Sequence, residues 1–139
     1  MKSVLFDINV VLDVLLDRKP NVGASAAAWA AIETRAANGF LAAHAVTTIH
    51  YLIRKELGAT KARRTISTML KVFGVAPVDG PVIQEALQLS FSDFEDAVTA
   101  AAARFAGCEY IVTRDPKGFR GSPVRALTPE AMAALWGQE

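Results

Sequence analysis

The sequence has one cysteine, little net charge and no long hydrophobic run, and each scarcity argues against a class of protein. Cys108 is the only cysteine, so a disulfide within the chain is impossible and a zinc site made of several thiolates is disfavoured. No stretch approaches the roughly 20 apolar residues of a membrane span, and the first residues do not follow a signal-peptide pattern. We therefore expect a soluble cytoplasmic protein that does not interact with membranes.

The length and composition indicate one ordinary globular domain. The chain has 139 residues, of which 52% are hydrophobic. A chain of this length buries about two-thirds of its unfolded surface, so neither a disulfide nor a structural metal is needed to hold a core. No internal repeat, low-complexity tract or linker divides the sequence. We predict a single domain over residues 1–139.

The net charge of +1 conceals a strong segregation of charge along the chain. Residues 50–76 carry a net charge of +5, residues 79–96 a net charge of −5, and residues 114–125 a net charge of +3. Such a distribution suits an acidic metal pocket with basic flanks that handles a polyanion. Solvated helix faces produce the same pattern, so composition alone leaves both interpretations open.

Short apolar runs alternate with helical patterns along the chain. The runs fall at residues 3–6, 40–43, 75–78 and 110–113, with a shorter extended piece at 124–127. Thr47 is the expected N-cap of the helix that follows the second run. This alternation predicts a three-layer α/β/α fold, in which helices cover both faces of a mainly parallel sheet of four or five strands.

Acidic residues follow two of the predicted strands and open one predicted helix. Asp7 follows the first strand, Asp115 follows the strand at 110–113, and Asp93 and Asp96 share the first turn of the helix between them. In parallel sheets, ligands bind at the carboxyl ends of the strands, near the point where strand order reverses. Four converging carboxylates repel one another unless a cation neutralises them. Oxygen ligands without sulfur favour Mg²⁺ or Mn²⁺, which can activate water against a phosphodiester.

Each acid also has a plain structural explanation. Asp7 can simply end a strand, Asp93 can complement a helix dipole, and Asp115 before a proline can start a turn. Asp96 is harder to explain in this way, because it lies beside the apolar face of its helix, where an unpaired carboxylate costs free energy. On spacing alone, the metal cluster and the plain explanations both remain open.

The ordered set of motifs resembles the PIN-domain family. The segments that carry the resemblance are FDINV at 6–10, DFEDA at 93–97 and VTRDP at 112–116, and their order and spacing match over essentially the whole chain. The resemblance implies a metal-dependent ribonuclease, and many small bacterial members are VapC-type toxins of toxin–antitoxin pairs. It further implies an RNA substrate, a cognate antitoxin and a homodimer.

The resemblance also assigns roles to residues. It implies that Asp7, Asp96 and Asp115 are catalytic metal ligands and that Asp93 is an accessory catalytic acid. Asn9 and Thr113 are then polar residues around the ligands. The basic residues near these motifs are expected to contact RNA phosphates, which positions a nucleic acid without reading its sequence; they are Arg18, Lys19, Arg114 and Lys117, with Arg120 as a further candidate.

One position departs from the family pattern. The family usually has a glutamate three residues after a threonine in the third helix, and here Thr47 leads to His50. A neutral imidazole removes one negative charge and can still ligate Mn²⁺, or contact a phosphate when protonated. His50 can equally be an ordinary polar helix residue, and His44 is expected to lie in a loop. The departure keeps open an alternative function, a catalytically weak PIN-like domain that binds RNA or protein.

A third interpretation comes from a different class of enzyme. An Asp-x-Asp start, as in haloacid dehalogenase-like phosphatases, would make Asp7 a nucleophile. The second acid of that pattern is Asn9 in this sequence, which removes the usual acid/base residue. This interpretation therefore ranks last.

Overall fold

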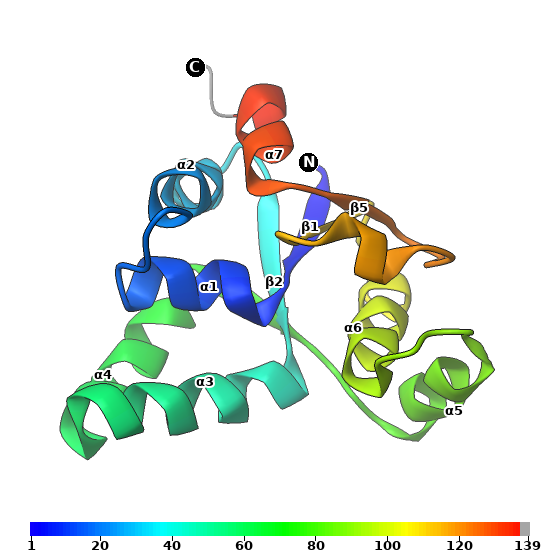
Figure 1. Cartoon of the computed structure of the whole chain (residues 1–139), viewed down its shortest axis with the longest axis horizontal. Helices are drawn as coiled ribbons and strands as arrows, with labels where there is room; N and C mark the ends of the chain where they lie inside the picture. The colour runs from blue at the N-terminus through cyan, green and yellow to red at the C-terminus, as the bar shows by residue number, and fades with distance from the viewer. Residues whose placement is uncertain (137–139) are drawn as a thin grey trace.

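The computed structural model describes residues 1–136 and has one five-stranded sheet with helices on both faces (Figure 1). The strand order is β3-β2-β1-β4-β5, and all four pairings are parallel. The strands are β1 (Ser3–Phe6), β2 (Asn38–Ala42), β3 (Phe73–Ala76), β4 (Tyr110–Val112) and β5 (Arg125–Leu127). The predicted α/β fold with a parallel sheet of four or five strands is therefore confirmed.

Seven α-helices and one short 3-10 helix connect the described strands. They are α1 (Ile8–Leu15), α2 (Val22–Glu33), α3 (Ala43–Leu57), α4 (Ala59–Met69), α5 (Gly80–Gln88), α6 (Phe94–Phe105), η1 (Pro116–Phe119) and α7 (Pro129–Trp136). Helices α1 to α4 lie on one side of the sheet and α5 and α6 on the other, while α7 packs against α2 (Figure 1). Within residues 1–136, no helix is both long and apolar enough to cross a membrane.

Each face of the sheet has its own hydrophobic core. Along β1, Val4 and Phe6 belong to the core under α1 and α2, whereas Leu5 belongs to the core under α5 and α6. This alternation follows from the two-residue period of a strand. On the first face, the Phe73 ring packs edge-to-face against Phe6 and Trp29, with ring centroids 5.1 and 5.0 Å away. On the second face, the buried alanines of α6 have small side chains that suit close packing of this helix on the sheet.

The third helix begins earlier than the sequence predicts. The chain leaves β2 at Ala42 with an extended backbone and enters α3 at Ala43 without an intervening loop. Thr47 is therefore inside the helix, where its hydroxyl donates to the His44 carbonyl over 2.9 Å instead of capping the first turn. The expectation of a loop at His44 is wrong, because this residue lies in the first turn of α3. His50 lies further along the helix than expected.

Candidate functional site

The carboxyl ends of β1 and β4 lie side by side where the strand order reverses. Phe6 pairs with Val112 in the parallel register, and the N–H of Asp7 donates to the Val112 carbonyl over 2.9 Å. Strands β2 and β3 extend the sheet on one side of this pair, and β5 extends it on the other. Asp7 and the loop that contains Asp115 therefore share the edge of the sheet at which such folds bind ligands.

The Thr113 hydroxyl joins the two strand ends. It is 1% exposed, donates to Oδ2 of Asp7 over 2.9 Å, and accepts the N–H of Asp115 over 3.1 Å. The other carboxylate oxygen of Asp7 accepts the N–H of Ile8 over 2.8 Å, so Asp7 is the N-cap of α1. Burial raises the pKa of Asp7, and the hydrogen bonds from Thr113 and Ile8 oppose that rise.

Helix α6 directs Asp96 toward the same edge. Asp93 is the N-cap of this helix, and its Oδ1 accepts the N–H of Asp96 over 3.2 Å. Burial raises the pKa of Asp96 to about 6, and the negative charges of Asp93, Asp7, Glu95 and Asp115 add to the rise. Carboxylates affect one another's pKa values in this way when they lie close together. The structure thus brings the four predicted acids together, with Glu95 as a fifth that the sequence analysis did not select.

Gly118 in η1 marks the place where two of these carboxylates meet. A Cβ atom at this position would lie 3.1 Å from Oδ2 of Asp115 and 3.5 Å from Oδ2 of Asp96. Both carboxylates therefore face the same small space beside the backbone of η1. A glycine leaves this space open, whereas a larger residue would crowd the Asp115 carboxylate.

The donor set has the chemistry of a site for a hard divalent cation. It consists of carboxylate oxygens, and the mutual repulsion that raises the pKa of Asp96 is what a bound cation would relieve. In the part of the chain that the structure describes, however, no three His, Cys, Asp or Glu side chains already form a metal-binding group. The acids are gathered at the edge, and binding a cation would require side-chain rotations to bring them onto it.

The two histidines differ in their relation to the acids. His44 is half-buried, its Nδ1 is buried without a hydrogen-bond partner, and burial lowers its pKa against the opposing charge of Glu95. His50 is also half-buried, and its side chain makes no hydrogen bond or ion pair among residues 1–136. His44 was expected in a loop because the start of α3 was placed too late, whereas His50 was selected from its place in the family pattern.

Asp13 is a buried acid that sequence reasoning missed. Its side chain is fully buried and pairs with two arginines, with Nε of Arg18 at 3.3 Å and Nε of Arg114 at 3.4 Å. The Ser25 hydroxyl donates to its Oδ2 over 3.2 Å. These contacts tie α1 to α2 and to the loop that leads into Asp115. A buried carboxylate in the middle of an apolar helix is itself the sequence signal, since such groups require partners.

These ion pairs change the expectation for the basic residues around the site. Arg18 and Arg114 were predicted to contact RNA phosphates, but their Nε atoms lie 3.3 and 3.4 Å from the Asp13 carboxylate oxygens. The terminal nitrogen of Arg18 also donates to the carbonyl and side-chain oxygens of Asn9, each over 3.4 Å. Lys19 and Lys117 are exposed. The two arginines therefore have a structural role, whatever contacts their remaining exposed surface makes.

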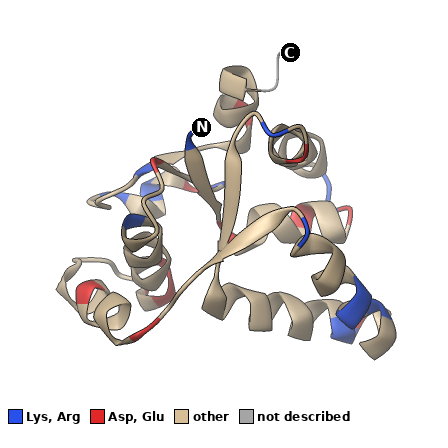
Figure 2. Cartoon of the chain, turned by 180° about the vertical axis from the view of Figure 1, so that it is seen from behind, with Lys and Arg blue, Asp and Glu red and all other residues tan. Residues whose placement is uncertain are grey.

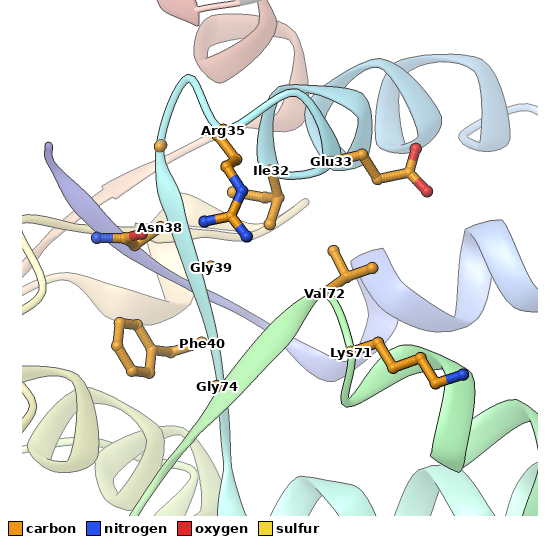
Figure 3. A pocket seen from close by; sticks show the side chains of 10 residues that line it. Ile32, Glu33, Arg35, Asn38, Gly39, Phe40, Lys71, Val72 and Gly74 are labelled. Atoms are coloured by element: carbon orange, nitrogen blue, oxygen red, sulfur yellow. The ribbon is translucent and has the colours of Figure 1, made fainter.

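A surface pocket of about 490 Å³ lies at the opposite edge of the sheet (Figure 3). It opens beside the amino-terminal ends of β2 and β3, where Gly39 and Val72 line it together with Arg35 and Lys71. A Cβ at Gly39 would lie 2.7 Å from the Ile32 side chain, so only glycine fits there. None of the predicted site residues lines this pocket, and we assign it no part in the chemistry of the acids.

Comparisons with known proteins agree with the fold described above. A family model described as PIN domain matches residues 3–117. Ribonuclease VapC1 of Aquifex aeolicus (strain VF5) is 24% identical over 140 residues, which cover 97% of this chain and 96% of that protein. The structure of FitAcB from Neisseria gonorrhoeae has a TM-score of 0.72 at 22% identity, covering 91% of this chain and 97% of that chain. DNA-bound VapBC from Salmonella typhimurium has a TM-score of 0.70 at 15% identity, covering 93% and 99%. At these identities, the two structures show a shared fold.

The buried ion pairs predict a large loss of stability when Asp13 is removed. Replacing Asp13 by Ala should lower the free energy of unfolding by about 2 to 3 kcal/mol, because Arg18, Arg114 and Ser25 lose their common partner. The partly exposed arginines regain water, which keeps the loss below that of a fully buried pair. Urea denaturation measures the change. Glu33→Ala on the exposed face of α2 is the control and should stay within about 0.5 kcal/mol of the wild type. Equal stabilities for the two variants would contradict a structural role for Asp13.

The raised pKa of Asp96 predicts a pH-dependent effect of removing its charge. The unfolded chain releases this proton near the ordinary pKa of 3.8, whereas the folded chain holds it until about 6, so its contribution to stability falls as pH rises between these values. Asp96→Asn should therefore stabilise the protein more at about pH 7.5 than at about pH 4, by about 1 kcal/mol after allowance for solvent screening. Urea denaturation in EDTA at both pH values tests this. An equal gain in the free energy of unfolding at both pH values would refute the raised pKa of Asp96. Glu130→Gln on α7 serves as the control.

Proposed function

The chain belongs to the PIN-domain family, and from this premise we propose that it is a metal-dependent endoribonuclease, the VapC-type toxin of a toxin–antitoxin pair. The observation that carries the proposal is the gathering of Asp7, Asp96 and Asp115 at one edge of the sheet, with Asp93 beside them. The ribonuclease name of the Aquifex aeolicus relative supports the same activity. The substrate we propose is RNA, cleaved at its phosphodiester bonds.

We assign the metal-binding role to Asp7, Asp96 and Asp115, which would hold Mg²⁺ or Mn²⁺. A cation of this kind, when bound, polarises a phosphodiester and makes hydroxide available from water near neutral pH. The remaining residues prepare the ligands. Thr113 orients one oxygen of Asp7 by donating a hydrogen bond to it. Asp93 fixes the backbone of Asp96 at the start of α6 and is the proposed accessory acid.

A phosphodiester strand approaches such a site only if positive charge surrounds the acids. Lys19 and Lys117 are exposed and are the proposed phosphate contacts. Arg18 and Arg114 keep part of their guanidinium surface exposed, 39% and 35% of the side chain, so they can add positive potential while paired with Asp13. Binding of this type weakens as salt rises, because phosphate contacts release counterions.

The proposed partners follow from the family and from the printed names of the structural neighbours. Several of these neighbours are named as VapBC or FitAB complexes, and some of them are described as bound to DNA. This supports a cognate antitoxin as the protein partner of the chain. A homodimer remains a prediction from the sequence resemblance, and a cytoplasmic location remains a prediction from the lack of a membrane-span or signal-peptide pattern.

A second candidate function is a catalytically weak PIN domain that binds RNA or protein. The observation that favours it is His50, which stands where the family usually has a glutamate. If that glutamate is needed as a ligand, this chain holds the cation with one carboxylate fewer. The two candidates differ in whether the purified protein cleaves RNA when Mn²⁺ is added.

Removing the carboxylate of Asp115 tests the main proposal. Asp115→Asn should weaken Mn²⁺ binding by at least about tenfold and reduce RNA cleavage, because carboxylate oxygens are the ligands this cation prefers. Titration calorimetry measures the affinity, and a labelled single-stranded RNA reports cleavage. The matched control is Glu109→Gln, since Glu109 precedes β4 at the opposite edge of the sheet, where its Oε1 accepts the N–H of Ser3. Unchanged Mn²⁺ affinity in Asp115→Asn would remove this residue from the ligand set.

Restoring the family's acid tests the second candidate. His50→Glu should tighten Mg²⁺ binding several-fold, because affinity for such cations rises with the number of ligand carboxylates. His50→Gln is the matched control, with the same length as glutamate but no charge. Both affinities and the cleavage rates are measured in one buffer. Wild-type cleavage as fast as that of His50→Glu would eliminate the catalytically weak alternative.

A further inference from the structure

A cleft of about 660 Å³ lies between the loop from α5 to α6 and the segment around η1. Lys117, one of the proposed phosphate contacts, lines this cleft together with Arg120. The two walls come from residues far apart in the chain, which helices α5 and α6 and η1 bring together on one side of the sheet (Figure 1). The lining residues are Gln88, Leu89, Ser90, Phe91, Ser92, Lys117, Gly118, Arg120 and Gly121.

The cleft opens directly beside the gathered acids. Gly118 lines the cleft and is also the residue whose Cβ position lies 3.1 Å from the Asp115 carboxylate and 3.5 Å from the Asp96 carboxylate. Ser92 lines the opposite wall and immediately precedes Asp93, the N-cap of α6. The cleft and the Asp96 and Asp115 carboxylates therefore share Gly118 as a common boundary.

The charge of the lining selects an anionic ligand. Lys117 and Arg120 are both exposed, and the nine lining residues include no Asp or Glu. The charged residues of α5 and of the first turn of α6 are acidic (Figure 2). The cleft is therefore a basic strip next to an acidic region. The serines of the lining add hydroxyl groups that can bond phosphate oxygens. Two cations on one strip suit two phosphates of one strand.

The wall that carries the two cations is held in place by its own contacts. The Phe119 side chain is 4% exposed and packs edge-to-face against Phe91 of the other wall, with ring centroids 6.0 Å apart. The N–H of Arg120 donates to the Lys117 carbonyl over 3.2 Å, and the N–H of Ser122 donates to the Phe119 carbonyl over 3.0 Å. Lys117 and Arg120 therefore project from an ordered turn, and less conformational entropy is lost when a ligand binds.

We propose that this cleft binds the stretch of single-stranded RNA next to the scissile phosphate, with Lys117 and Arg120 each contacting a backbone phosphate. The proposal rests on the proposed ribonuclease function and deepens it, because it gives the strand a path away from the acids. Lys117 and Arg120 are the two predicted phosphate contacts that line the cleft, whereas Arg18 and Arg114 pair with Asp13. The contacts are to the backbone, so binding in the cleft is the same for different base sequences.

The test compares a double substitution in the cleft with the substitution of one basic residue outside the cleft. Lys117→Ser combined with Arg120→Ser should weaken binding of a labelled 12-nucleotide single-stranded RNA about tenfold, measured by fluorescence anisotropy in EDTA so that no cleavage occurs. The slope of log affinity against log salt should become shallower by about 1.4, which corresponds to about 0.7 for each lost phosphate contact. Arg125→Ser on β5 is the matched control, because Arg125 is exposed but does not line the cleft. It should change the affinity less than about twofold.

The outcomes separate this proposal from the proposed function. The cleft proposal fails if the double variant binds RNA as tightly as Arg125→Ser does, or if it keeps the wild-type salt slope. The ribonuclease proposal stands in that case if the wild type cleaves RNA with Mn²⁺. If the wild type binds RNA through the cleft but does not cleave it with Mn²⁺, the activity fails and the cleft stands as a binding site. Poly-glutamate that displaces RNA completely and binds more tightly than RNA would assign the cleft to an acidic protein partner and overturn the proposal. Circular dichroism of each variant checks that the fold is kept.

Discussion

The hydrogen bonds of the Thr113 hydroxyl fix the geometry on which the candidate site depends. They join a carboxylate that follows β1 to the backbone of the loop that follows β4, across the reversal of strand order. The strand pairing alone brings Asp7 and Asp115 to the same edge. The buried hydroxyl then sets one oxygen of Asp7 and the backbone of Asp115 relative to each other, so the two strand ends form one structural unit.

Gathering acids at one edge has an electrostatic cost, and the fold offsets part of it locally. Asp7 accepts a backbone N–H at the start of α1, and Asp93 accepts one at the start of α6, where a helix N-terminus favours negative charge. The positive charge of Arg114 opposes the rise in the pKa of Asp7. Asp96 is the acid whose pKa is raised to about 6, by its burial first and then by the negative charges of Asp93, Asp7, Glu95 and Asp115. Neutralisation by a divalent cation is the remaining way to lower that cost.

Positive charge is placed in two different ways around these acids. Arg18 and Arg114 are anchored to the buried Asp13, and they stiffen the contact between α1, α2 and the loop before η1. Lys117 in η1 and Arg120 just after it line a cleft that also includes Gly118, the glycine beside the Asp96 and Asp115 carboxylates. A further group of basic residues lies on α4 and the adjoining end of α3, away from this cleft (Figure 2). The near-zero net charge of the chain therefore says little about the potential that a ligand meets.

The sequence by itself determined the fold class and the family, because both depend on local patterns. Apolar runs alternating with helical patterns predict a parallel sheet with helices on both faces, and the motifs around Asp7, Asp96 and Asp115 place acids at its carboxyl edge. Only the tertiary structure decided which other groups join them. The start of α3 at Ala43, the pairing of Asp13 with two arginines and the meeting of carboxylates at Gly118 depend on contacts between segments far apart in the chain. Local spacing carries no information about such contacts, because they are set by how strands and helices pack together.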